Sequence, residues 1–194
     1  MKLLIGLGNP GERYHNTRHN LGFLALDHFA GDCGFGFSRK KHDALWARGV
    51  CGGQEFIAIK PQTFMNLSGI AARAFAEEYQ ISPEEVIILC DDIYQPFGRL
   101  RIRKAGSAGG HNGLASVIEC LGADSVMRIR LGVGKPEDES ADLADYVLSA
   151  LTAVESERVP VLCGWVSKAI ALILQGDINK AMNICHGRDC GEAE

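Results

Sequence analysis

The feature that most constrains this chain is a strand–loop–helix pattern in its first thirty residues. A short apolar run at 3–5 is typical of a buried strand, and it breaks into a loop of glycine, asparagine and proline, GLGNPG at 6–11. His19 follows at the start of an amphipathic stretch. Open α/β sheets usually place their binding sites in loops that leave the end of a strand. We therefore expect the site at this loop, with His19 as catalytic base and Asn9 in contact with the substrate.

Strand and helix patterns alternate along the rest of the chain, whose 194 residues are the size of one domain. Further strands are expected at 44–50, 55–60, 86–90, 98–103 and 127–133. Helices are expected at 20–30, from 69 to about 79, and at 114–121, 142–149, 152–175 and 177–186. The strands at 44–50 and 55–60 would form a hairpin, and Pro160 would kink the long helix or delay its start. This pattern predicts one mixed-sheet α/β domain over 1–194, with 187–194 as a frayed tail.

Composition excludes several classes of protein. No apolar run reaches the roughly 18 residues that a membrane span needs, and the N-terminus has no signal-peptide pattern. The 7 cysteines are irregularly spaced without a C-x-x-C, so we expect reduced, mostly buried thiols in a cytoplasmic protein without membrane association. Cys185, His186 and Cys190 lack a fourth ligand, and no metal site is expected there.

Charge is unevenly distributed along the chain, although the net charge is only −4. Residues 95–135 hold 7 basic and 2 acidic side chains, a local charge of +5, whereas 136–194 carry −7. A basic patch on an acidic protein can bind a polyanion locally. Alternating arginines on a strand are also compatible with an ordinary solvated face, and charge alone leaves both readings open.

The loop at 6–11 also matches the dinucleotide-binding pattern G-x-G-x-x-G after a strand. Pro10, however, removes a backbone N–H where a phosphate loop needs donors. Residues 12–18 are polar and lack the apolar stripe of the helix that should follow. A dinucleotide site is therefore disfavoured.

A set of polar residues instead points to a site for carbonyls and phosphates. Asp91 follows a buried apolar run, so its carboxylate could accept the Nδ1–H of His19, fix the tautomer and stabilise the imidazolium. Asn9, Asn66 and Asn112 each lie in a loop beside glycine, proline or serine. Any one of these asparagines could simply form a turn. Three amides together with a His/Asp pair favour a binding site.

The chain offers no convincing nucleophile, since it has no G-x-S-x-G motif and neither Ser68 nor Ser107 has an obvious base nearby. Paired histidines and carboxylates at metal-binding spacing are also missing. The expected chemistry is therefore attack by water with help from a histidine base. Amide side chains would bind the carbonyl and its developing oxyanion.

Five motifs in this order resemble the bacterial peptidyl-tRNA hydrolase family, and the resemblance extends over essentially the whole chain. They are GLGNPG (6–11), TRHN-x-G (17–22), P-x-TFMN-x-SG (61–69), DD after a buried strand (91–92) and GGHNGL (109–114). The resemblance implies a single α/β domain with a twisted mixed sheet surrounded by helices. It also implies an enzyme that cleaves the ester between a peptide and the 3′ end of tRNA, as a monomer, without cofactor or metal.

The resemblance assigns roles to individual residues. His19 matches the catalytic base, Asp91 its supporting carboxylate, and Asn9 the residue that distinguishes peptidyl from free aminoacyl substrates. The other matching positions contact tRNA or line the site: Tyr14, Phe64, Met65, Asn66, His111 and Asn112, with Arg103 and Arg130 as looser matches to basic tRNA-binding residues.

The chain departs from the family pattern at Cys90 and at 94–95, next to Asp91. The alternative function is a non-catalytic RNA-binding scaffold on the same fold. The presence of the His/Asp pair and of all three asparagines favours the enzyme.

Overall fold

The computed structural model describes residues 1–138 and 140–186, and the expected tail at 187–194 lies outside these ranges. Its centre is a seven-stranded mixed sheet in the order β2-β3-β4-β1-β5-β7-β6. The strands are β1 (Lys2–Gly6), β2 (Arg39–Lys41), β3 (Ala44–Cys51), β4 (Gln54–Pro61), β5 (Val86–Asp92), β6 (Leu100–Arg103) and β7 (Met127–Gly132). β4, β1, β5 and β7 run parallel, while β2, β3 and β6 pair antiparallel to their neighbours.

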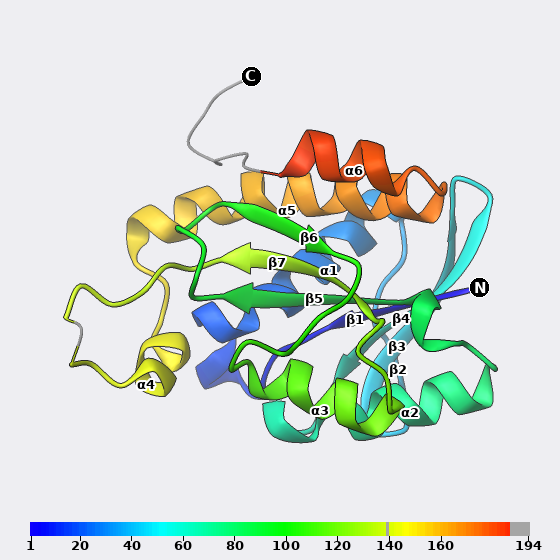
Figure 1. Ribbon diagram of the computed structural model, residues 1–194, viewed down its shortest axis with the longest axis horizontal. Helices are drawn as coiled ribbons and strands as arrows, with labels where there is room; N and C mark the ends of the chain where they lie inside the picture. Colours follow the sequence, from blue (N-terminus) through cyan, green and yellow to red (C-terminus); the bar gives the residue numbers. More distant parts are fainter. Residues whose placement is uncertain (139, 187–194) are drawn as a thin grey trace.

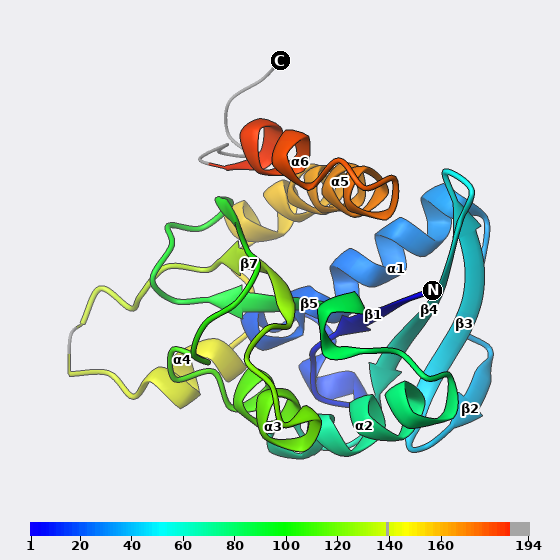
Figure 2. The same ribbon diagram turned by 45° about the vertical axis from the view of Figure 1, so that its right-hand side comes forward.

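Helices cover both faces of the sheet (Figures 1 and 2). They are α1 (Leu21–Cys33), α2 (Ser68–Glu78), α3 (Asn112–Leu121), α4 (Leu143–Leu148), α5 (Ala153–Leu174) and α6 (Ile178–Cys185), with short 3₁₀ turns η1 (Glu12–Tyr14), η2 (Arg18–Asn20), η3 (Met65–Leu67) and η4 (Pro83–Glu85). Within residues 1–138 and 140–186, no helix is long and apolar enough to cross a membrane.

Successive side chains of a strand point to opposite faces of the sheet, so two separate hydrophobic cores form. In β1, Leu4 faces a core shared with α1, α5 and α6, whereas Leu3 and Ile5 face a core shared with α2 and α3. The helix that follows β1 therefore lies on one face of the sheet, and the helix that follows β4 lies on the other. Such a switch point opens a crevice at the carboxyl ends of the strands.

The start of α1 packs against the backbone of β5 and of the residue that follows β1. A Cβ on Gly22 would overlap the carbonyl oxygens of Leu7 and Leu89, so only glycine allows this approach. The preceding turn, η2, is thereby held over the ends of β1 and β5. It carries His19.

Most expected elements are confirmed, and the main differences are an added strand, a later end of α1 and the effect of Pro160 on the long helix. β2 occupies residues expected to form a loop, because its short run adds to the edge of the hairpin. α1 continues past Gly31 to Cys33, where Gly34 at φ 71° supplies the left-handed C-cap. α5 does not start late: a capping box of Thr152 and Glu155 begins it, and the helix continues through Pro160.

The cysteines are less buried than expected. Of the six described cysteines, only Cys90, Cys163 and Cys185 are buried. Burial raises the pKa of the Cys90 thiol to about 12. Cys90 therefore stays a neutral thiol and does not act as a nucleophile beside Asp91.

Candidate active site

A pocket of about 570 Å³ opens at the carboxyl ends of β1 and β5. It brings together residues from loops that are far apart in the sequence. Ten of the residues singled out from the sequence line it: Asn9, Tyr14, His19, Phe64, Met65, Asn66, Asp91, His111, Asn112 and Arg130. Arg103 does not line this pocket; it is exposed on β6, opposite Arg128 in the register of the sheet.

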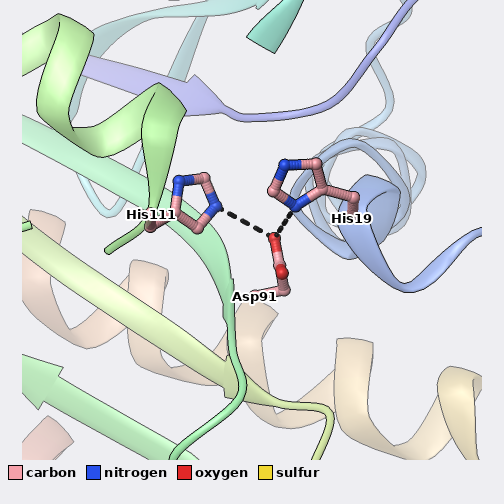
Figure 3. Close-up of side chains that lie close together, drawn as sticks. All are labelled: His19, Asp91 and His111. Atoms are coloured by element: carbon pink, nitrogen blue, oxygen red, sulfur yellow. Dashed lines mark hydrogen bonds and ion pairs between the residues drawn. The ribbon is translucent and has the colours of Figure 1, made fainter. Parts of the chain in front are cut away.

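Two histidines share one carboxylate oxygen at the centre of the pocket (Figure 3). Asp91 Oδ1 lies 2.9 Å from Nδ1 of His19 and 3.0 Å from Nε2 of His111. All three residues are buried. Burial of Asp91 disfavours its charged form, but the two imidazoles outweigh this cost and hold the pKa of the carboxyl well below its usual range. Asp91 is therefore a carboxylate at neutral pH.

The hydrogen bonds determine which ring nitrogens carry protons. The backbone N–H of Leu114 donates to Nδ1 of His111 at 3.1 Å. Neutral His111 therefore carries its proton on Nε2 and donates it to Asp91. His19 must also donate from Nδ1 to the same carboxylate, which leaves its Nε2 unprotonated. Among the described residues Nε2 of His19 has no partner, so it is free to accept a proton in the pocket.

His19, Asp91 and His111 have the residue types of a metal-binding triad. The bond from Leu114 argues against that use. In a neutral metal-bound histidine, the nitrogen that does not bind the metal donates a hydrogen bond. In His111, Nδ1 instead accepts a hydrogen bond from the backbone N–H of Leu114. The ring that faces Asp91 is thus arranged to donate a hydrogen bond rather than to bind a cation.

The amide of Asn9 is oriented by the protein. Its Oδ1 accepts the backbone N–H of Met65 at 2.8 Å. The side chain of Asn20 meanwhile bonds both backbone polar groups of Asn9, at 2.8 and 2.9 Å. The Nδ2 group has no partner among the described residues and lies on the pocket. Asn9 therefore presents a hydrogen-bond donor to the site.

The other two asparagines lie at the starts of helical turns and are exposed. Asn66 belongs to η3, and Asn112 begins α3 beside the N-cap His111. Neither side chain bonds another described residue, so both amides are available to a ligand in the pocket. Phe64, 59% exposed, and the half-buried Tyr14 add aromatic surface at the rim.

A second cavity of about 370 Å³ adjoins the first and is lined by four arginines, Arg101, Arg103, Arg128 and Arg130. Arg128 is not part of a solvated face, because it is 1% exposed and donates to the backbone oxygens of Gly106 and Asp124. Arg130 lies 3.5 Å from Asp92 and also holds the loop before His111 through Ala108 O. The exposed Arg103 has no ion-pair partner among the described residues.

Two contributions to the site were not predicted from the sequence. The first is the apolar wall, one side of the pocket formed by α4 through Leu143, Ala144, Val147 and Leu148. The sequence indicates this wall only through Leu143 and Val147, two apolar residues four positions apart that lie on the same face of a helix. The second is Asn20, which fixes the Asn9 loop although it does not line the pocket.

Comparison with known proteins places the chain in a family. Residues 3–193 match the family described as peptidyl-tRNA hydrolase. A protein named peptidyl-tRNA hydrolase from Lachnoclostridium phytofermentans is 44% identical over 190 residues, covering 97% of this chain and 98% of that protein. One from Clostridium botulinum is 42% identical over 187 residues, covering 96% of each. The crystal structure of peptidyl-tRNA hydrolase from Acinetobacter baumannii superposes with a TM-score of 0.89 at 30% identity, covering 98% of this chain and 96% of that one. The chain belongs to the peptidyl-tRNA hydrolase family of enzymes.

Proposed function

We propose that this enzyme hydrolyses the ester that joins a peptide to the 3′ end of tRNA, with His19 as general base. The observation that carries the proposal is the hydrogen-bond pattern around Asp91. It leaves Nε2 of His19 free in a pocket that also holds the donor of Asn9. Family membership supports the same substrate.

The reaction follows from these groups. Nε2 of His19 takes a proton from water as the water oxygen attacks the ester carbonyl. Asp91 stabilises the imidazolium that forms. The Asn66 and Asn112 amides are the donors available to the oxyanion. When the tetrahedral intermediate collapses, the ribose oxygen leaves and takes the proton from His19, which gives a free peptide acid and tRNA with its terminal hydroxyl.

Turnover of N-acetylated aminoacyl-tRNA by the purified protein tests the proposed function. We expect catalytic release of tRNA that can be aminoacylated again, and much slower release from the unblocked aminoacyl-tRNA. Binding of tRNA without turnover of the blocked substrate would instead indicate an RNA-binding scaffold.

Replacing Asp91 by asparagine should lower kcat by roughly 10²-fold, at the lower end of the contribution of general-base catalysis. The amide oxygen can still accept from both rings, but the neutral amide no longer supplies the charge that stabilises the imidazolium formed on His19. The matched control is Asp92→Asn, since Asp92 is equally buried but faces Arg130 and the N–H of Tyr94. A larger loss of kcat in the control would show that the wrong acid was chosen.

Asp91 should also affect stability in a pH-dependent way. Because its folded pKa is lowered, ionised Asp91 stabilises the fold above about pH 4, and this contribution is lost as the pH falls through the folded value. The difference in unfolding free energy between wild type and Asp91→Asn should therefore be larger at pH 7 than in strong acid. Equal differences across a urea-unfolding series would contradict this effect.

The basic cavity beside the pocket is suited to phosphates of the tRNA. Arg103→Ala and Arg130→Ala should each weaken tRNA binding and reduce the slope of log K against log salt by roughly 0.7 to 0.9 per lost phosphate contact. The control is Arg48→Ala, because Arg48 is an exposed arginine of β3 that pairs with Glu55 of β4. Unchanged slopes would show that these two arginines do not contact phosphates of the tRNA.

A short substrate without most of the tRNA separates the two arginines. We expect Arg103→Ala to leave its hydrolysis nearly unchanged, because Arg103 lies outside the main pocket. Arg130, in contrast, lines the pocket and holds the loop before His111. Arg130→Ala should therefore slow the short substrate as well.

A further inference from the structure

Arg18 lies directly before His19 and is buried, with a side chain only 7% exposed. Its Nε and Nη2 form a bidentate pair with the Glu155 carboxylate at 3.0 and 2.6 Å. Its guanidinium also stacks over the ring of Tyr146, 4.4 Å from the centroid. A buried, planar and bidentate arrangement of this kind fixes geometry more strictly than a surface ion pair.

These contacts tie the catalytic turn to the segment that follows α4. Nη1 of Arg18 donates to Ser149 Oγ at 2.5 Å and to Ala150 O at 3.1 Å. The backbones of the two segments also pair: Leu151 N donates to Asn16 O at 2.8 Å. Glu155 lies in the first turn of α5 and accepts from Thr152 N as well. The connection from α4 to α5 is therefore fastened to η2 through both side chain and backbone.

The apolar wall depends on this connection for its position. α4 has six residues, and Leu143 and Leu148 remain substantially exposed. Two side-chain hydrogen bonds join α4 to the body of the protein among the described residues: Arg18 Nη1 donates to Tyr146 O at 3.5 Å, and Tyr146 Oη donates to Val133 O at 2.7 Å. So short a helix has little stability of its own. The contacts of Arg18 therefore add to the few that join α4 and the segment after it to the catalytic turn.

We propose that Arg18 is a positioning residue that holds the apolar wall against the catalytic turn, so that the peptidyl part of the substrate is bound in register with His19. This proposal rests on the proposed function, because the wall is taken to contact the peptidyl part. Arg18 itself does not line the pocket. Its loss should therefore affect substrate binding more than the proton transfer.

The experiment compares Arg18→Lys and Glu155→Gln with wild type. Lysine keeps the charge but not the bidentate fork. Glutamine at 155 removes the charge but can still complete the capping box of α5. Glu155→Gln therefore tests the contact between Arg18 and Glu155 even if Arg18→Lys fails to fold. The control is Lys60→Met, which removes another mostly buried cation, paired with Asp27, away from α4.

We expect KM for N-acetylated aminoacyl-tRNA to rise about tenfold in both variants while kcat changes by less than about threefold, a size typical of coupling through packed contacts. Amide hydrogen exchange should accelerate in 143–150 in both variants and stay at the wild-type rate there in Lys60→Met. These readouts differ from a general loss of stability, which would accelerate exchange throughout.

Wild-type exchange in 143–150 in both variants, or a loss confined to kcat, would overturn the proposal. An inactive wild type would instead refute the proposed function. The exchange measurement does not depend on activity, so it would still show whether Arg18 holds α4.

Discussion

Replacing His19 by alanine is expected to lower kcat by about 10² to 10⁴-fold, the usual contribution of a general base. In the structure His19 is the pocket residue whose ring offers an unprotonated nitrogen: Nδ1 is engaged by Asp91, while Nε2 is free. His111 cannot substitute, because its Nδ1 accepts from Leu114 N and its Nε2 donates to Asp91. Single-turnover hydrolysis of N-acetylated aminoacyl-tRNA measures the loss.

The fold and the affinity for tRNA should be nearly unchanged in this variant, since the basic cavity does not include His19. A matched control is His28→Ala. His28 lies on α1 with Asp32 as its acidic neighbour at 3.8 Å, but its ring is more exposed and does not line the pocket. Near-normal turnover by His19→Ala would exclude His19 as the base.

The second large effect is expected at Asn9, which should set the choice between peptidyl and free aminoacyl esters. A peptidyl ester has an amide carbonyl next to the scissile bond, where an aminoacyl ester has an ammonium. Nδ2 of Asn9 can donate to that carbonyl, and its orientation is fixed because Oδ1 is engaged by Met65 N. A site built for one hydrogen bond rejects an analogue that leaves the bond unmade.

Asn9→Asp keeps the acceptor for Met65 and replaces the donor by a second oxygen. We expect kcat/KM for the blocked substrate to fall by about 10²-fold or more. The carboxylate should at the same time favour the ammonium of the unblocked substrate. The ratio of kcat/KM for the two substrates, in wild type and variant, is the measurement. An unchanged ratio would mean that Asn9 only forms a turn and that Asn66 or Asn112 discriminates.

The sequence predicted the sheet well because its strands carry strong local signals. The run at 86–90 is buried on both faces, and the hairpin is marked by two glycines with φ of 58° and 80°. β2 could not be predicted, since three basic residues have no strand pattern and pair only because the β3 edge is available. The end of α1 was misplaced because Gly31 and Gly34 are both plausible stops, and the C-cap geometry decides between them.

The candidate site was predictable to the extent that its residues follow strand ends and loop motifs. His19, Asp91 and Asn9 come together because β1 and β5 are adjacent and parallel. The burial of Arg128 was not predictable, because strand alternation does not reveal that the loop at 105–111 covers one arginine and leaves its neighbours accessible. The contribution of Arg18 depends on Glu155, 137 positions away, a distance that no local pattern spans.

The central claim is that Asp91 leaves Nε2 of His19 as an unprotonated base. Nitrogen-15 NMR of the ring nitrogens, at a pH where both imidazoles are neutral, tests it most directly, with His19→Ala and His111→Ala used for assignment. We expect opposite tautomers: the proton on Nδ1 in His19 and on Nε2 in His111. A proton on Nε2 of His19 would contradict it.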